Sequence, residues 1–123
     1  MKTVVCILLI SAFFLACSGK GSSTNAACGV DNPIEDLAWL KAYVDETEDS
    51  SEELSRYLYV LKGIYNEETV FIFDNCCPFC NTIVPVYDCE GKSLGFLNDK
   101  VNRSEIKHTE IIYQPDNFAC STD

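Results

Sequence analysis

The chain has 123 residues, and its 19 acidic against nine basic side chains give a formal net charge of −10. This balance excludes a general nucleic-acid-binding role, because such a role needs basic patches that neutralise phosphates. It also argues against electrostatic docking on an anionic membrane surface.

The N-terminal segment has the pattern of a secretory signal. Lys2 is followed by apolar residues over 4–10 and 12–16, and then by Cys17. A charged start, an apolar centre and a small-residue end are the features of an export signal. The apolar stretch is also shorter than the roughly 20 residues that a membrane-spanning helix needs. The sequence therefore predicts a signal peptide over residues 1–16, which is removed from the mature protein.

Phe14-Leu15-Ala16-Cys17 resembles the lipobox of bacterial lipoproteins, in which a small residue precedes a cysteine. Phe14 stands where that family usually has leucine or another aliphatic residue. The resemblance implies that Cys17 is acylated, with palmitate among the acyl groups, and becomes the new N-terminus. Two or more acyl chains anchor a protein stably, whereas one chain binds only marginally.

Residues 17–27 are mostly small and polar, which favours a flexible tether. The rest of the chain, residues 28–123, is long enough for one small domain. We therefore expect an exported protein that is anchored to the bacterial cell envelope, at the outer membrane or on the periplasmic face. We expect the lipid on Cys17 to be the protein's contact with the membrane.

Six cysteines remain in the domain once Cys6 leaves with the signal and Cys17 carries lipid. An even number of cysteines in an exported chain favours disulfides, although their pairing stays open. Zinc is the competing explanation, because two of the cysteines have ligand spacing. No second close Cys or His pair accompanies them, so we expect neither a metal nor a cofactor. The disulfide candidates are Cys28, Cys76, Cys77, Cys80, Cys89 and Cys120.

The first predicted element is a helix that begins at Asn32 and ends near Asp45. Asn32 is a typical N-cap, Pro33 suits the first helical position, and Glu35 can close a capping box. The acidic run 45–53 lacks the ligand spacing and the glycine of a calcium loop, and we expect a solvated loop there. Apolar residues at helical spacing predict the buried face of the helix: Ile34, Leu37, Leu40 and Val44.

Five segments rich in aromatic and β-branched residues predict strands. Pro85 predicts an edge or a bulge in the third strand, and Asn102 or Ser104 begins a short helical turn before the fifth. The predicted fold is α+β: one N-terminal helix packed on an antiparallel meander of four or five strands, held by disulfides. The predicted strands are residues 57–64, 69–74, 82–89, 93–97 and 109–113.

The segment 70–85, which contains Cys77-Pro78-Phe79-Cys80, resembles the active-site segment of thioredoxin-like oxidoreductases. The resemblance implies that Cys77 is the nucleophile and that Cys80 resolves the mixed disulfide. In that family the motif opens a helix, whereas residues 82–87 here favour a strand. The chain after Pro85 is also too short for the family's later strands. We therefore expect a structural cysteine cluster, and catalysis by Cys77 and Cys80 is the alternative.

Three further segments, residues 32–41, 77–80 and 86–92, together resemble small bacterial lipoproteins of unknown function. This resemblance implies one helix followed by a short sheet, and no assigned activity. The only histidine, His108, stands in a polar stretch and is expected on the surface, without a catalytic partner. The aromatic residues are candidates for a recognition face, although most should be core: Tyr57, Tyr59, Tyr65, Phe71, Phe73, Phe79 and Tyr87.

The function that these observations predict is that of a lipid-anchored envelope protein. We expect a non-catalytic binding or interaction module for a protein or small ligand that the sequence does not identify. The alternative is an envelope thiol–disulfide oxidoreductase that uses the pair Cys77 and Cys80.

Overall fold

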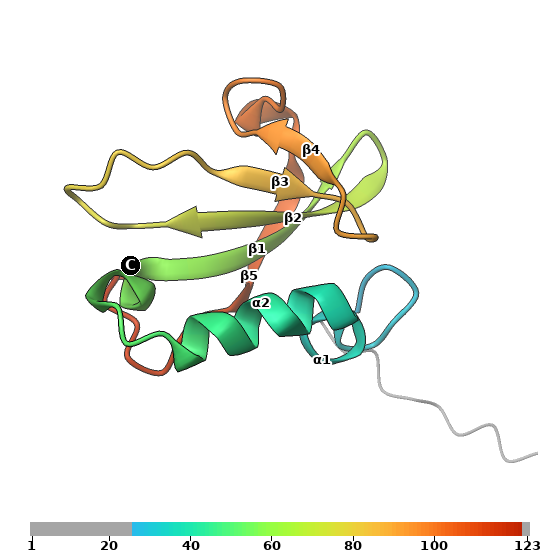
Figure 1. Ribbon diagram of the computed structural model, residues 1–123. Coiled ribbons are helices and arrows are strands. Elements are labelled where there is room, and N and C mark those ends of the chain that lie inside the picture. Colours follow the sequence, from blue (N-terminus) through green and yellow to red (C-terminus); the bar gives the residue numbers. More distant parts are fainter. Residues whose placement is uncertain (1–25, 122–123) are drawn as a thin grey trace, which may run out of the picture.

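The structure, a computed structural model, describes residues 26–121 and has one main helix packed on a five-stranded antiparallel sheet (Figure 1). The predicted α+β class is thus confirmed, while the predicted signal peptide, Cys17 and most of the tether lie outside the described residues. Two 3₁₀ turns cover Glu53–Tyr57 and Arg103–Glu105. The elements are α1 (Pro33–Asp36), α2 (Ala38–Asp49), β1 (Leu58–Tyr65), β2 (Glu68–Asn75), β3 (Pro85–Tyr87), β4 (Ser93–Phe96) and β5 (Lys107–Tyr113).

The predicted helix is interrupted at Leu37, whose extended backbone separates α1 from α2. The predicted capping box is wrong, because the Asn32 side chain caps no amide and the Asn32 backbone N–H instead donates to Asp36 Oδ2 at 3.0 Å. The predicted end is also wrong, since α2 continues through Asp49. Thr47 is buried on this added turn, and its hydroxyl donates to the Tyr43 carbonyl at 2.9 Å. The first half of the acidic run is therefore helix.

Strands β1 to β4 form a meander, but β5 returns to the other side of β1, so the sheet order is β4-β3-β2-β1-β5. The predicted meander is therefore wrong for the fifth strand. The connection from β4 to β5 crosses one face of the sheet, where Leu97 and Val101 are buried against Val70, Ile72 and Val86. Burying these apolar side chains carries the chain across the sheet to the free edge of β1.

Turn chemistry matches the predicted hairpin of the first two strands, whereas the predicted third strand, residues 82–89, is shortened to Pro85–Tyr87. Asn66 and Glu67 have φ angles of 48° and 65° between β1 and β2, as a two-residue hairpin turn requires. Pro85 is the first residue of β3, which is an inner strand, and the register of β3 with β4 shifts beyond Val86. The predicted turn before β5 is confirmed, because Asn102 Oδ1 accepts from the Ser104 N–H at 3.0 Å.

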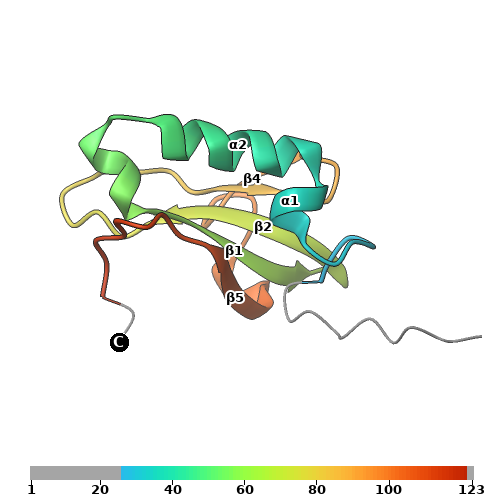
Figure 2. The same ribbon diagram turned by 90° about the horizontal axis from the view of Figure 1, so that it is seen from below.

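Side chains of β2 alternate between two apolar clusters on opposite faces of the sheet. Figures 1 and 2 show α2 running across one face, where Leu40 and Val44 pack with Phe71 and Phe73. Trp39 stacks on the Phe73 ring and meets the Phe71 ring edge-on, and its indole Nε1–H donates to the Cys89 carbonyl at 2.9 Å. The helix is thus fixed to the sheet by aromatic contacts and one polar contact.

Candidate functional site

Three disulfides pair all six cysteines of the described chain, so the predicted disulfide framework is confirmed. One joins the start of the domain to the turn between β3 and β4, and a second joins the end of β2 to the C-terminal segment. The third closes the Cys-x-x-Cys motif on itself. The pairs are Cys28–Cys89, Cys76–Cys120 and Cys77–Cys80.

The three bridges differ in how much chain they constrain. Their sequence separations are 61 residues for Cys28–Cys89, 44 for Cys76–Cys120 and three for Cys77–Cys80. In the chain-entropy model a bridge across a loop of the longer kind stabilises a fold by about 4 kcal/mol, and one across so short a loop by about 2 kcal/mol. Cys77–Cys80 is therefore the bridge that the fold needs least.

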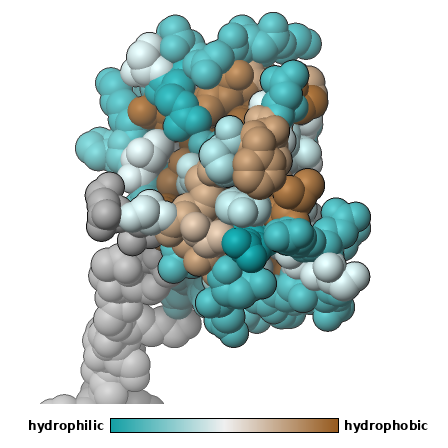
Figure 3. Space-filling view, turned by 90° about the vertical axis from the view of Figure 1, so that its left-hand side faces the viewer, coloured by the Kyte–Doolittle hydropathy of each residue, from teal (hydrophilic) through white to brown (hydrophobic). Residues whose placement is uncertain are grey.

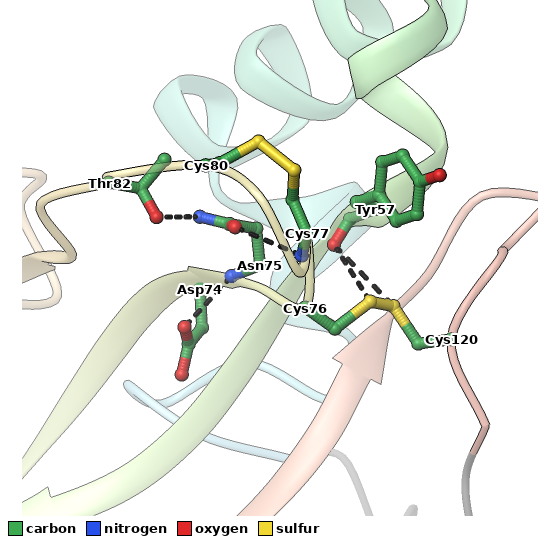
Figure 4. Close-up of a disulfide and its surroundings, with 8 residues drawn as sticks. All are labelled: Tyr57, Asp74, Asn75, Cys76, Cys77, Cys80, Thr82 and Cys120. Atoms are coloured by element: carbon green, nitrogen blue, oxygen red, sulfur yellow. Dashed lines mark hydrogen bonds between the residues drawn. A yellow bond between two sulfur atoms is a disulfide. The ribbon is translucent and has the colours of Figure 1, made fainter.

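Figure 4 shows the loop between β2 and β3 that carries the Cys77–Cys80 bridge, and how its root is fixed. Asn75 Oδ1 accepts from the Cys77 N–H at 3.3 Å, and Asn75 Nδ2 donates to Thr82 Oγ1 at 2.8 Å. The Cys76 N–H donates to the Tyr57 carbonyl at 3.2 Å. Polar contacts thus hold the two ends of the loop, while Pro78 and Phe79 between the bridged cysteines are exposed.

The Cys77–Cys80 bridge lines an open hollow of about 360 Å³. The hollow lies between the second half of α2, the 3₁₀ turn that follows it and the β2–β3 loop. Four large side chains join the bridge in its lining: Tyr43, Leu54, Tyr57 and Leu58. Figure 3 looks at this end of the molecule and shows apolar residues gathered within a hydrophilic surround.

The apolar surface continues onto the loop itself. Phe79 is 75% exposed and Ile83 is 71% exposed, and Leu54 on the opposite wall is 49% exposed. The Phe79 ring meets the Tyr57 ring edge-on, with 6.2 Å between their centroids. Exposed large apolar side chains that gather on one surface mark interaction sites more often than scattered ones do.

Of the seven aromatic candidates for a recognition face, only Tyr57 and Phe79 lie at this site. Phe71 and Phe73 are buried beneath α2, as expected for core residues. Tyr43 was not among the candidates, although its ring lines the hollow. Burial raises the pKa of Tyr43 above its ordinary value, so its phenol is neutral at physiological pH.

Carboxylates give the rim of the hollow a negative charge. Glu46 and Glu52 line it, and they belong to the run 45–53 with its six carboxylates. None of the residues that line it is basic. Arg56 is the basic residue next in sequence to the lining residue Tyr57. Its guanidinium lies over the Tyr57 ring, 5.2 Å from the ring centroid.

The surroundings of the bridge differ from those of catalytic dithiols. Reactive cysteines usually lie at a helix N-terminus or beside a basic side chain, which stabilises the thiolate. Cys77 follows a strand, and residues 76–84 contain no helix. The site therefore provides an accessible disulfide in an apolar, acidic setting, without a basic side chain among the residues that line it.

Neither a metal centre nor a membrane-spanning helix is found in the part of the chain that the structure describes. Between residues 26 and 121, no group of three or more His, Cys, Asp or Glu side chains is placed to hold a metal ion. Over the same range, no helix combines the length and the hydropathy needed to cross a bilayer. His108 is exposed on β5, as expected. It lines a second hollow, at the β1–β2 end of the sheet, and not the hollow beside the Cys77–Cys80 bridge.

The sequence singled out Cys77 and Cys80 but left their pairing open, and it did not reveal the hollow. Leu54 was the available signal, because it is a single large apolar residue next to the acidic run. Comparisons with known protein families, with curated proteins and with solved structures find no match for this chain. The function is therefore argued from the site alone.

Proposed function

We propose that this protein is a lipid-anchored binding module of the bacterial cell envelope, which docks a segment of a partner polypeptide that has apolar side chains and basic flanks. The observation that carries the proposal is the open apolar hollow beside the Cys77–Cys80 bridge, with its rim of carboxylates. The anchor is the acyl-cysteine expected at Cys17, as in the bacterial lipoproteins that the N-terminal segment resembles.

Apolar contact supplies the attraction in this proposal. Leu54 lines the hollow, and Phe79 and Ile83 expose further large apolar side chains on the β2–β3 loop that borders it. Covering such surface is worth about 25 cal/mol for each Å² removed from water. An apolar partner segment would therefore gain more here than on the polar surface around it.

The negative charge around the hollow favours a partner segment whose flanking residues are positively charged. Glu46 and Glu52 line the hollow, and α2 ends at Asp49 with the negative end of its dipole directed towards the same region. The whole chain is strongly acidic, so it attracts cationic partners over longer distances as well. An acidic partner segment would be repelled by all of these charges.

The hollow lies at the end of the domain away from the expected tether. Ala26 shares a separate hollow with Ile64 and Thr69, at the β1–β2 turn. Leu58, at the other end of β1, lines the binding hollow. Ile64 lies six positions after Leu58 along β1, which corresponds to about 20 Å. A domain anchored through residues 17–27 would thus present the hollow on its far side.

A selection of peptides tests the binding proposal. The oxidised protein is screened against a displayed library of random 12-residue peptides, and we expect enriched peptides to combine apolar residues with Lys or Arg. Leu54→Asp should weaken their binding about tenfold or more, since it places a charge on the apolar wall. Ile111→Asp is the matched control, because Ile111 is 42% exposed on β5 and does not line the hollow.

The rim is tested with a second matched pair. The double change Glu46→Gln and Glu52→Gln should weaken binding several-fold and reduce its dependence on salt. The double change Glu67→Gln and Glu68→Gln removes the same charge from the exposed β1–β2 turn and should leave affinity unchanged. Failure to enrich any peptide, or equal effects of both pairs, would overturn the proposal.

Anchoring is tested by labelling cells with a radioactive fatty acid. We expect label in the wild-type protein and none in Cys17→Ser. Undiminished label in that variant would contradict the lipid anchor and would leave the binding proposal to stand on the peptide selection.

A second candidate function, an envelope thiol–disulfide oxidoreductase, is favoured by one observation: the Cys77–Cys80 bridge opens onto a surface where a substrate could dock. The absence of a basic lining residue argues against it. An insulin-reduction assay separates the two candidates. Turnover faster than dithiothreitol alone, and lost in Cys80→Ser, would support the enzyme, whereas an unchanged rate would reject it.

A further inference from the structure

The tip of the β2–β3 loop is held mainly by the Cys77–Cys80 bridge. Apart from the turn at residues 78–79, residues 78–83 of the described chain have no backbone–backbone hydrogen bond to the rest of the fold. The tip's other contacts are the hydrogen bond from Asn75 to Thr82 and the edge-on contact of Phe79 with Tyr57. Breaking the bridge would therefore free the tip while its root stays in place.

Around the two long-range bridges, hydrogen bonds to the backbone hold the chain on both sides. Beside Cys76–Cys120, the Cys76 N–H donates to the Tyr57 carbonyl at 3.2 Å and the Ala119 N–H donates to the Arg56 carbonyl at 3.0 Å. Beside Cys28–Cys89, Trp39 donates to the Cys89 carbonyl, and residues 27 and 30 pair with each other. The fold thus keeps these thiols opposite one another, so their bridges would re-form readily.

From this difference we propose that Cys77–Cys80 is a redox-controlled element of the binding hollow: the oxidised bridge holds the hollow in its binding form, and reduction weakens binding. The inference rests on the proposed binding function. Both cysteines line the hollow, and the wall that they form ends in the exposed Phe79. If residues 77–80 are free, binding must order that wall again, and this entropy loss weakens the affinity for the partner.

The chemical step needs a dithiol of the envelope as reductant. One thiolate of that dithiol attacks a sulfur of the bridge, which breaks the Cys77–Cys80 bond and forms a mixed disulfide. The second thiolate of the reductant then displaces the remaining cysteine sulfur. Two electrons and two protons pass from the dithiol to Cys77 and Cys80, and the reductant leaves as a disulfide.

The acidic surroundings suit a switch better than a catalyst. Glu46 and Glu52 line the same hollow and disfavour negative charge on the reduced sulfurs, while no basic lining residue offsets them. Rapid exchange requires a substantial thiolate fraction. The bridge would therefore change state slowly and stay in one state during many binding events.

The experiment measures peptide affinity in both redox states of the full-length mature protein. The probe is the tightest peptide from the selection, and dithiothreitol sets the redox state. Alkylation followed by mass spectrometry should label Cys77 and Cys80 before the other four cysteines. We expect the dissociation constant to rise about tenfold in that state, which is within the usual range of allosteric coupling.

Linkage supplies an independent readout. If reduction weakens peptide binding by a given factor, saturating peptide must shift the thiol–disulfide equilibrium of the bridge by the same factor. The double variant Cys77→Ser and Cys80→Ser should bind as weakly as the reduced protein. Mild reduction of the wild-type protein provides the same state if that variant does not fold.

The outcomes separate the two proposals. Equal affinity in the oxidised and reduced states, with the peptide still bound, overturns redox control and leaves the binding function intact. Loss of the long-range bridges before Cys77–Cys80 also overturns it. A protein that binds no peptide in either state overturns the binding function and this inference together.

Discussion

Gly91 lies directly beneath the indole ring of Trp39, where an added Cβ atom would approach the ring carbon Cδ2 to 2.8 Å. Trp39 itself donates to the Cys89 carbonyl, two residues before Gly91. The β3–β4 turn and α2 are thus joined by a ring packed on a glycine and by a hydrogen bond, and the Cys28–Cys89 disulfide ties the same turn to the start of the domain.

We expect Gly91→Ala to lower the free energy of unfolding by about 2–4 kcal/mol. The change combines a steric clash with strain, because Gly91 has a φ angle of 79°. Gly29→Ala is the control, since Gly29 has a similar φ of 76° but no atom within 4 Å of its added Cβ. Urea unfolding followed by the fluorescence of Trp39 measures both, and equal losses would contradict the packing argument.

The bridges should differ in their effect on stability. Replacing Cys28 and Cys89 together by serine should lower the free energy of unfolding by about 4 kcal/mol, because it frees a loop of 61 residues in the unfolded chain. Replacing Cys77 and Cys80 together should cost no more than about 2 kcal/mol. Urea unfolding at fixed pH compares them, and a larger loss for the second pair would assign a structural role to the motif.

An ion pair joins the connection before β5 to the end of β2. Arg103 Nη2 donates to Asp74 Oδ2 at 2.7 Å, and Asp74 is only 6% exposed while the Arg103 side chain is about half exposed. Arg103→Ala should lower the free energy of unfolding by about 1–2 kcal/mol, since it leaves a buried carboxylate without its cation. In an Asp74→Asn background the same change should cost clearly less. Additive losses in this double-mutant cycle would show that the pair contributes nothing.

Stability in alkali should depend on Tyr113. Burial, followed by the nearby Glu48 carboxylate, raises the pKa of Tyr113 from 10.0 to about 12. Because the pKa of the folded state lies above that of the unfolded state, this contribution is complete below pH 10 and is lost as the pH rises to 12. The loss reaches about 2 kcal/mol at pH 12.

Tyr113→Phe tests this pH dependence. The Tyr113 hydroxyl is buried and, within the described chain, has no hydrogen-bond partner. The variant should therefore be as stable as the wild type at pH 7, or slightly more stable. Between pH 10 and pH 12 it should lose less stability than the wild type, as measured by urea unfolding at each pH. Parallel curves for the two proteins would contradict the assignment.

Local patterns in the sequence were enough to predict the approximate place of the main helix and of the strands, because secondary structure depends largely on near neighbours. Segments rich in aromatic and β-branched residues predicted strands close to β1 and β2, and the helical spacing of Leu40 and Val44 predicted the buried face of α2. Asn102 predicted the turn before β5, because its side chain caps the backbone only two residues further on. Cysteine number and the export pattern predicted disulfides but left their pairing open.

How distant segments meet depends on tertiary packing. Strand β5 pairs with β1 because Leu97 and Val101 carry the chain across the sheet, which no local period reveals. The hollow forms because the end of α2, the turn with Leu54 and the Cys77–Cys80 loop converge from three parts of the chain. Local patterns report which side of an element is buried, whereas a surface shared by distant elements depends on the packing of the whole fold.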